Sequence, residues 1–268
     1  MLQDIAPHRF NNAFRADCQP REDDYVIIVE GNKVVQHNHR ELPRVKDVDG
    51  GELIYLFAID ETRYYLADSV TVPKGYTFDT IRGMGDQTQM FAAATALQLA
   101  RWYANNRYCG HCGHEMIRDH VERKMVCPHC GHFVYPHIAP AVIVGVRNGD
   151  QLLLSQSALG HYRHYAMIAG YTEVGETIEE TVRREVFEEV GLKVKNITYY
   201  RSQPWSFSDS LLLGFYCDVD GDPTITVDHH ELSLAIWTPR NDIPLHPDNI
   251  SLTGEMMKRF KEGKDQQL

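Results

Sequence analysis

Three glutamates in the C-terminal half of the chain have the spacing of a metal site. Glu185, Glu188 and Glu189 stand at positions i, i+3 and i+4, so a helix would project their carboxylates from one face. Residues 170–192 contain seven acidic residues and two arginines, and such a cluster repels itself unless a cation neutralises it. A hard divalent cation takes oxygen ligands of this kind. The alternative is a solvated acidic helix face, and the glutamates alone do not decide between the two.

The segment around these glutamates has the local signals of a short amphipathic helix. Thr177 and Glu180 form a capping-box pattern at its start, and Gly191 suits the position just after its end. We therefore predict a helix at about 178–190. An apolar stripe with helical spacing would face the core, and it consists of Ile178, Val182, Val186 and Val190.

Four of the six cysteines form two CxxC pairs separated by fourteen residues: Cys109, Cys112, Cys127 and Cys130. Each pair places two thiolates on one tight turn, and two such turns can close a tetrahedron around zinc. Gly113 and Gly131 follow the two pairs and tolerate the positive φ that such a turn needs. Four protein ligands leave no open position for a reactive water, so the sequence predicts one structural zinc per chain. The alternative is a set of reduced cysteines without a metal.

Four histidines lie close to these cysteines and could compete with them as ligands: His111, His114, His129 and His132. Because four cysteines already fill a tetrahedral site, we expect the histidines to be solvated.

The composition excludes several classes of protein. The 268 residues carry 27 Lys and Arg against 37 Asp and Glu, a net charge of 27 − 37 = −10, which argues against broad nonspecific binding to nucleic acid. The apolar runs have only strand length, so we expect no transmembrane helix and no membrane partner. The first residues, MLQDIAPHRFNNAF, lack the basic stretch and apolar core of a signal peptide. We therefore expect a cytoplasmic protein whose cysteines are thiols or metal ligands.

The order of strand and helix signals predicts an α+β fold with three parts. We expect a β-rich N-terminal domain with a linking helix over 1–105, a four-cysteine zinc ribbon over 106–136 and a mixed α/β domain over 137–268. The predicted strands are 25–29, 53–57, 64–66, 141–147, 151–155, 197–201, 211–217 and 233–238. The predicted helices are 87–105, 178–190 and 251–262.

The complete pattern around the glutamates resembles the signature of Nudix hydrolases. It runs from Gly170 through five residues to Glu176, then through seven residues to Arg184, and ends on Gly191 and Leu192. The resemblance implies a mixed α/β/α sandwich that hydrolyses a nucleoside diphosphate linked to another group. It also implies Mg²⁺ or Mn²⁺ held by Glu185, Glu188, Glu189 and the backbone carbonyl of Ala169, with a salt bridge between Glu176 and Arg184.

A second motif resembles one particular group of Nudix hydrolases. The segment from Ser202 to Ser210 reads SQPWSFSDS and is similar to the SQPWPFPxS motif of NADH pyrophosphatases, also known as NAD-capped RNA hydrolases. The family prolines are Ser206 and Ser208 here, which predicts a more mobile and less selective loop. The alternative is that Trp205 only packs at the surface. The resemblance covers roughly residue 90 to the C-terminus.

The resemblance also implies substrate contacts and a late metal ligand. It places Tyr171 against the nicotinamide and assigns substrate contacts to Glu122 and Tyr135. It assigns a late metal-binding role to Glu231, although Leu234 stands where the family has a second acid. The family forms homodimers with sites built across the interface. The remaining substrate-binding positions that it implies are Gln203, Pro204, Trp205, Ser206, Phe207, Ser208, Asp209 and Ser210.

These expectations combine into one predicted activity and two rivals. A metal-activated water would split NAD(H) into NMN(H) and AMP, with Glu189 as general base or principal metal ligand, and NAD caps on RNA 5′ ends would be a further substrate. The first rival is a Nudix pyrophosphatase for ADP-ribose or dinucleoside polyphosphates. The second is a nucleic-acid-binding protein with a dead Nudix domain. Residues 101–137 hold five Lys and Arg against three acids, which is only mildly basic, and no defined position of the glutamate motif is lost.

Overall fold

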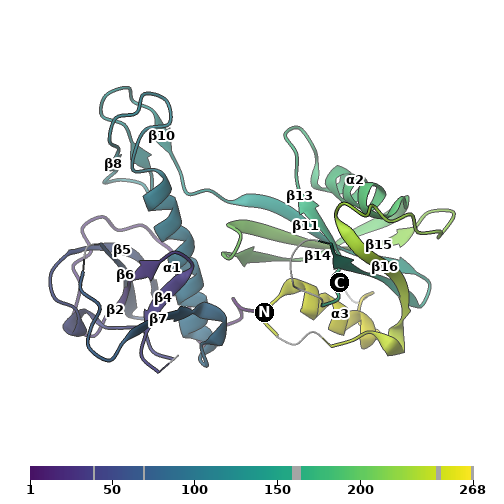
Figure 1. The fold of residues 1–268 in the computed structure, drawn as a ribbon, viewed down its shortest axis with the longest axis horizontal. Coiled ribbons are helices and arrows are strands. Elements are labelled where there is room, and N and C mark those ends of the chain that lie inside the picture. The colour runs from purple at the N-terminus through teal and green to yellow at the C-terminus, as the bar shows by residue number, and fades with distance from the viewer. Residues whose placement is uncertain (39, 69, 159–163, 246–248, 267–268) are drawn as a thin grey trace. The chain divides into compact units, whose positions relative to one another are not determined.

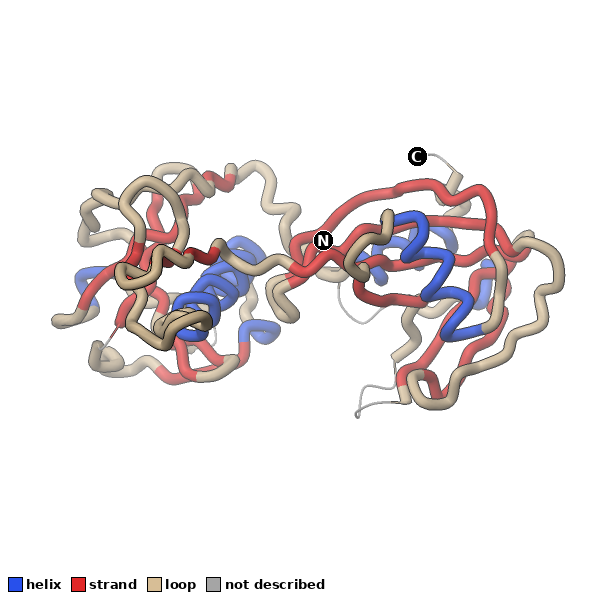
Figure 2. The backbone as a smooth tube through the Cα atoms, turned by 90° about the horizontal axis from the view of Figure 1, so that it is seen from above, coloured by secondary structure: helices blue, strands red, loops and turns tan. Residues whose placement is uncertain are grey.

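The computed structural model describes residues 1–38, 40–68, 70–158, 164–245 and 249–266. Its chain forms two compact units, Leu2–His137 and Met1 with Ile138–Leu268. The four-cysteine segment therefore belongs to the same unit as the N-terminal strands. Both units are built mainly from strands and loops, as the colouring of Figure 2 shows. None of the helices in the described ranges is long and apolar enough to span a membrane.

The described part of the first unit contains three small sheets. The largest has the order β1 (Phe10–Asn11), β5 (Glu52–Ile59), β6 (Thr62–Asp68) and β2 (Tyr25–Ile27). The second has the order β3 (Val29–Glu30), β4 (Lys33–Gln36) and β7 (Thr77–Thr80). The third joins β10 (Phe133–Val134), β9 (Met125–Val126) and β8 (Ile117–Arg118). Short 3-10 turns at Val45–Asp47 and Ile81–Gly83 link these strands.

One long helix, α1 (Gln87–Asn105), packs against the first sheet and leads to the cysteines (Figure 1). The carboxylate of Asp86 caps it by accepting a hydrogen bond from the N–H of Gln89 at 2.7 Å. Five of its six alanines are buried, which lets the helix approach the strands closely. The ring of Phe91 meets that of Phe10 edge-on at 5.0 Å. The predicted helix over 87–105 is confirmed at both ends.

The second unit is a six-stranded mixed sheet. Its path runs β14 (Val194–Trp205), β15 (Ser210–Val219), β11 (Ala139–Asn148), β12 (Gln151–Ser157) and β16 (Leu232–Pro239), with β13 (Ile168–Tyr171) paired to β11. Strands β11 and β15 pair in parallel, and the other described pairs are antiparallel. A 3-10 turn at Arg240–Asp242 follows β16.

Two helices cover opposite faces of this sheet, α2 (Ile178–Val190) and α3 (Leu252–Lys261) (Figure 1). Because side chains alternate along a strand, Val142 and Val144 face the α2 side, where they join the buried Val182 and Val186. Ile143 faces the α3 side. Each fully buried side chain of this size stabilises the fold by about 1.5–3 kcal/mol. The predicted α+β class with an α/β/α sandwich at the C-terminal end is confirmed.

Several strands differ from their predicted bounds. The run predicted as one strand over 25–29 breaks at Ile28, because β2 pairs in parallel with β6 while β3 turns to pair with β4. Strand β13 was not predicted, since its Ala-Gly pair has little strand preference and only its pairing with β11 defines it. The helix predicted over 251–262 is one residue shorter at each end.

Candidate active site and metal centres

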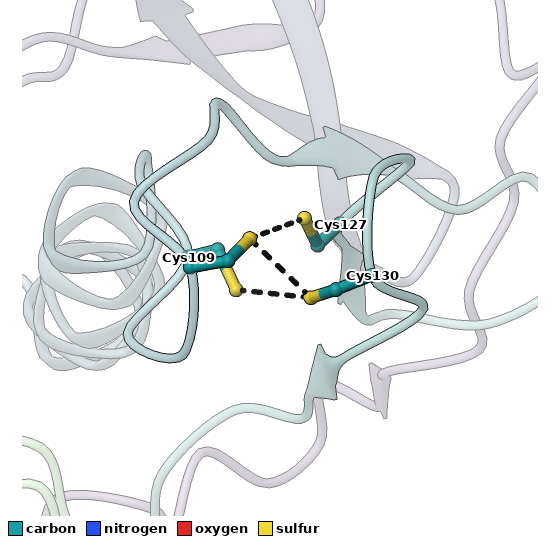
Figure 3. Close-up of side chains that lie close together, drawn as sticks. Cys109, Cys127 and Cys130 are labelled. Carbon is teal, nitrogen blue, oxygen red and sulfur yellow. Dashed lines mark hydrogen bonds between the residues drawn. The ribbon is translucent and has the colours of Figure 1, made fainter.

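The four predicted zinc ligands come together at the end of the first unit. One sulfur atom from each of the four cysteines lies within 4.8 Å of the others. The Sγ of Cys112 lies 3.5 Å from that of Cys127 and 3.4 Å from that of Cys130, and the Cys109–Cys130 distance is 3.7 Å. Figure 3 shows three of these side chains converging on one point. A tetrahedron with zinc–sulfur bonds of about 2.3 Å has edges of about 3.8 Å, so the cluster fits zinc.

Two turns of the same geometry build this cluster. The N–H of Cys109 donates to the carbonyl of His114 at 2.8 Å, and the N–H of Cys127 donates to that of His132 at 2.8 Å. The turns close at Gly113 and Gly131, whose φ values are 76° and 77°. Burial opposes ionisation of Cys127, but backbone hydrogen bonds outweigh it and lower the pKa of its thiol to about 7. The backbone thus favours the thiolate form that a metal binds.

The four neighbouring histidines are exposed, as predicted for solvated side chains. The rings of His114 and His129 stack at 3.8 Å with their planes 5° apart. One nitrogen of each lies within 4.8 Å of the sulfur of Cys112. The four sulfurs alone complete a tetrahedral site, so the coordination needs no histidine.

The glutamate motif is divided between a loop, β13 and α2. The hydroxyl of Thr177 accepts from the N–H of Glu180 at 3.2 Å, and the Glu180 carboxylate accepts from the N–H of Thr177 at 2.8 Å, which completes the predicted capping box. Glu185 and Glu189 are buried, whereas Glu188 is exposed.

Gly170 on β13 makes room for Glu185. A Cβ at position 170 would lie 2.0–2.1 Å from the carboxyl atoms of Glu185, far inside van der Waals contact. Any other residue would therefore displace this carboxylate. The glycine permits the close approach of β13 and α2 at the site.

Arg184 binds several parts of the motif at once. Its Nε and NH2 donate to the two carboxylate oxygens of Glu176 at 2.6 and 2.9 Å, and its NH1 donates to Glu185 at 2.7 Å and Glu188 at 2.9 Å. NH2 also donates to the carbonyl of Tyr171 at 2.8 Å. The guanidinium lowers the pKa of Glu176 to about 2. Arg184 thereby clamps the loop to α2 and neutralises part of the acidic cluster.

Glu189 has an incompletely paired carboxylate in a buried position. Its side chain is 4% exposed, and within the described residues its Oε1 has no hydrogen-bond partner. Burial, and next the charge of Glu185, raise the pKa of Glu189 to about 8, while a backbone hydrogen bond from Ala169 opposes this rise. Burial also raises the pKa of Glu185. An orphaned carboxylate oxygen beside other carboxylates fits a divalent cation, which would supply the missing partner.

The other predicted metal ligands do not form a closed ligand shell with Glu185 and Glu189. Glu231 is exposed, and its charge raises the pKa of both Glu185 and Glu189. In the described ranges, no set of three carboxylates has one oxygen from each within 4.8 Å of the other two. The backbone N–H of Asp228 donates to the carbonyl of Glu189 at 2.9 Å, which holds the segment before Glu231 at the C-terminal end of α2.

Sequence reasoning missed one acid near this centre. Asp228 also raises the pKa of Glu189, and it lies three residues before Glu231. The family pattern has its second acid three residues after Glu231, where this chain has Leu234. The signal was present in the segment Asp228-His-His-Glu231, in which two acids are three residues apart.

The segment resembling SQPWPFPxS forms the hairpin between β14 and β15. Ser206 and Ser210 are buried, and the hydroxyls of Ser208 and Ser210 lie 2.9 Å apart. Ser210 also donates to the hydroxyl of Tyr171 at 3.4 Å, so the structure brings the hairpin and Tyr171 together. The rings of Trp205 and Phe207 meet edge-on at 4.9 Å. The half-exposed indole and the exposed Tyr171 ring offer aromatic surface within this unit.

Gln203 lies in a different environment from the rest of this segment. Its side chain is fully buried, its Nε2 donates to the carbonyl of Ile250 at 2.7 Å, and its Oε1 accepts from the N–H of Leu252 at 2.6 Å. The amide thus fastens β14 to the start of α3. Pro204, the next residue, is exposed.

The two remaining predicted substrate contacts belong to the first unit. The hydroxyl of Tyr135 donates to Glu122 at 2.9 Å, and the ammonium of Lys124 donates to the same carboxylate oxygen at 2.9 Å. Lys124 and Tyr135 lower the pKa of Glu122. The structure therefore brings Glu122 and Tyr135 together as an exposed, hydrogen-bonded pair of a carboxylate and a neutral phenol.

Comparison with known proteins agrees with both centres. Residues 137–260 match the NUDIX domain, and residues 104–135 match the NADH pyrophosphatase zinc ribbon domain. The NAD-capped RNA hydrolase NudC of Shigella flexneri is 47% identical over 160 residues, which cover 58% of this chain and 60% of that protein. The protein of the same name from Escherichia coli O9:H4 (strain HS) is 46% identical over the same shares. The match thus spans less than two thirds of the length of these relatives.

A solved structure shows the same fold. The NUDIX hydrolase from Nitrosomonas europaea superimposes with a TM-score of 0.50 at 21% identity, covering 59% of this chain and 92% of that one. The chain therefore carries a Nudix domain that directly follows a zinc ribbon of the NADH pyrophosphatase kind.

Proposed function

We propose that the chain hydrolyses the diphosphate of NAD(H) to NMN(H) and AMP, and that it also removes NAD caps from RNA 5′ ends. The observation that carries the proposal is the buried, unpaired Oε1 of Glu189 within a complete Nudix motif. The choice of substrate is supported by the zinc ribbon match and by relatives named NAD-capped RNA hydrolase.

The residues that would hold the catalytic cation are those of the motif and its surroundings. We assign Glu185, Glu188 and Glu189 as carboxylate ligands, with the carbonyl of Ala169 and the carboxylate of Glu231 completing the shell. Mg²⁺ or Mn²⁺ bound there supplies charge neutralisation for the diphosphate and makes water a better nucleophile. The four cysteines would hold a zinc ion with a structural role only.

The chain's own groups orient and deprotonate the reactants. Arg184 holds Glu185 and Glu188 in place through its NH1 and fixes the loop through Glu176. The Oε1 of Glu189 is the atom suited to bind the cation or to take the proton of the attacking water, because it is buried without a partner among the described residues and a bound cation would favour the carboxylate form that either role needs. The same Oε1 could thus serve as metal ligand or as general base.

The hairpin would bind the nicotinamide half of the substrate. Tyr171 and Trp205 provide rings on which nicotinamide can stack, and the Ser208–Ser210 hydrogen bond restrains a tip that lacks the two prolines. The placement of Gln203 supports a positioning role, since its amide is bonded to the start of α3. Contacts of Glu122 and Tyr135 with substrate, the homodimer and the cytoplasmic location remain predictions.

The test compares substrates that separate the proposal from its rivals. NADH and ADP-ribose are incubated with the protein and Mg²⁺ or Mn²⁺, as are NAD-capped and triphosphate transcripts of one sequence. We expect NMNH and AMP from NADH, little turnover of ADP-ribose, and 5′-monophosphate RNA only from the NAD-capped transcript. Preferred hydrolysis of ADP-ribose would assign the site to another Nudix specificity. An intact NAD-capped RNA alongside rapid NADH hydrolysis would remove only the RNA part of the proposal.

A further inference from the structure

The two turns of the cysteine cluster carry histidines in the same positions. Residues 109–114 and residues 127–132 both read Cys-x-His-Cys-Gly-His, so each turn has one histidine between its cysteines and one after its glycine. All four rings are exposed to solvent. Neutral imidazole is a common ligand of zinc and other transition-metal ions, so these histidines can extend the metal chemistry of the ribbon beyond its four sulfurs.

The histidines of the two turns form two pairs that differ in geometry. The rings of His114 and His129 stack with their centres 3.8 Å apart and their planes 5° apart. The ring centres of His111 and His132 are 6.3 Å apart, with the planes at 39°. In the described part of the chain, only the first pair joins a group of three potential ligands, in which one nitrogen of each histidine and the sulfur of Cys112 all lie within 4.8 Å of one another. The repeated sequence therefore produces one candidate site and not two.

A hydrogen bond to the backbone prepares His114 for metal binding. Its Nδ1 lies 3.2 Å from the carbonyl oxygen of Cys112. Because a carbonyl oxygen can only accept, Nδ1 carries the proton, and in the neutral ring Nε2 then has a free lone pair. Histidines that bind metals commonly donate their other ring nitrogen to a backbone carbonyl in this way, which fixes the tautomer.

The sulfur of Cys112 connects this group to the four-cysteine site. Cys112 is half-buried, whereas Cys109 and Cys127 are buried, so Cys112 belongs to the more accessible side of the cluster. Four thiolates around one Zn²⁺ leave the cluster with more negative than positive charge, which attracts a further cation. A thiolate that already binds one zinc keeps lone pairs on its sulfur, so the same sulfur can bridge to a second ion.

The dimensions of the group fit a tetrahedral ion after a small rearrangement. Zinc with bonds of about 2.0–2.1 Å to nitrogen and about 2.3 Å to sulfur holds two nitrogens about 3.3 Å apart and places each about 3.6 Å from the sulfur. The stacked rings direct their lone pairs side by side, so both rings have to rotate toward the ion. Since His114 and His129 are exposed, this rotation needs no change in the core. The fourth position stays open to water.

We propose that His114, His129 and Cys112 bind a second Zn²⁺ ion, with the thiolate of Cys112 bridging to the structural zinc and a water molecule as fourth ligand. The site depends on the structural zinc and is independent of the proposed hydrolase activity. Because the second ion has a water ligand and lies at the surface, it binds more weakly than the structural zinc. A mild chelator therefore removes it first and leaves one zinc per chain.

The test is titration of the full chain, loaded with one zinc, with Co²⁺ as a coloured substitute for the second Zn²⁺. Excess Mg²⁺ is present throughout to occupy the carboxylate centre, since Mg²⁺ prefers oxygen ligands and does not compete for imidazole or thiolate. Co²⁺ bound to a thiolate absorbs in the near ultraviolet by charge transfer, and Co²⁺ bound to oxygen ligands does not. We expect this absorption to saturate at one Co²⁺ per chain, while elemental analysis still finds one zinc per chain.

Variants of the two histidine pairs provide the matched comparison. His114→Asn and His129→Asn should each weaken Co²⁺ binding at least tenfold, because loss of a group that merely orients a ligand already costs about 10–100-fold in metal affinity. The double variant His111→Asn with His132→Asn removes two exposed histidines from the same turns and should leave binding unchanged. Zinc content and melting curves show whether each variant keeps the folded ribbon.

Three outcomes would overturn the proposal. The first is that no thiolate absorption develops in the zinc-loaded wild type at millimolar Co²⁺. The second is absorption that grows while zinc is lost, because Co²⁺ then replaces the structural ion and occupies no second site. The third is equal Co²⁺ affinity in the wild type, His114→Asn and His129→Asn, which would mean an adventitious ion only.

Discussion

Four sulfur atoms of the zinc ribbon lie within 4.8 Å of one another, whereas no three carboxylates in the described ranges bring one oxygen each that close together. In the ribbon, two backbone turns place the ligands without help from other side chains. In the Nudix domain, Arg184 holds two carboxylates while the Oε1 of a third stays buried and unpaired. This difference in how closely the ligands approach one another matches the two roles that we propose for the bound ions. A structural ion needs a closed, complete shell, while a catalytic ion needs ligands that leave room for substrate and water.

The largest expected effect is on turnover, and it tests the open centre, which is the carboxylate group of Glu185, Glu188 and Glu189. Glu189→Gln keeps the size of the side chain and removes the charge, so NADH turnover should fall by about 10²–10⁴-fold. The fold should persist, because a neutral amide costs less to bury than a carboxylate. Turnover and thermal melts of the same preparation check this, with Glu179→Gln on the exposed start of α2 as the matched control. A folded variant with near-wild-type turnover would contradict the assigned role of Glu189.

At the four-cysteine site, a substitution should lower stability rather than act first on turnover. Cys109→Ser removes one of four ligands, so zinc content and melting temperature should both fall, because metal-binding free energy contributes to folding. Cys217→Ser, at a buried cysteine outside the cluster, is the control for loss of a thiol. Zinc content measured by elemental analysis, together with melting curves, decides the matter. Wild-type protein without zinc would end the structural-zinc interpretation.

Arg184→Lys probes what holds the open centre together. Lysine keeps the charge and loses the planar fork that binds both oxygens of Glu176, so we expect about 10–100-fold lower kcat/KM and weaker Mg²⁺ activation. Arg183→Lys, one position away and exposed, should stay within a factor of two. Equal activity in both variants would mean that the clamp does not position the ligands.

The change per pH unit is the smallest of the expected effects, and its direction separates the two centres. Glu189 has a pKa of about 8 in the folded state against an ordinary 4.5, so the folded state holds its proton more tightly. Its contribution to stability without divalent cation is therefore full below pH 4.5 and is lost as pH rises from about 4.5 to about 8, on the order of 1 kcal/mol per pH unit. Zinc binding by thiols weakens in the other direction, as pH falls. Denaturant unfolding at pH 5 to 8, wild type minus Glu189→Gln, measures the first trend, and added Mg²⁺ should flatten it.

Local sequence signals predicted the parts of the site that depend on neighbours in the chain. Helix α2 begins and ends where predicted, because Thr177 caps its start and Gly191, with φ of 71°, ends it. The two cysteine turns follow from CxxC-Gly in the same way. These features need only a few consecutive residues.

Features that depend on distant segments were not predictable. Gln203 binds residues 250–252, nearly fifty positions away, so nothing near it in the sequence indicates its burial. Strand β13 exists through pairing with β11, and Gly170 is required by Glu185 on another element. The position of Asp228 beside Glu189 depends on a backbone bond across the end of α2. Tertiary packing decides each of these.

We propose that one chain holds two metal centres of different kinds, one closed and structural, the other open and catalytic. The most direct measurement is zinc content and NADH hydrolysis of the same protein after a mild chelator wash, before and after Mg²⁺ or Mn²⁺ is added back. We predict one zinc retained per chain, no hydrolysis in the washed protein, and full recovery with Mg²⁺ or Mn²⁺ alone. Hydrolysis that follows the zinc content and ignores added Mg²⁺ and Mn²⁺ would contradict this claim.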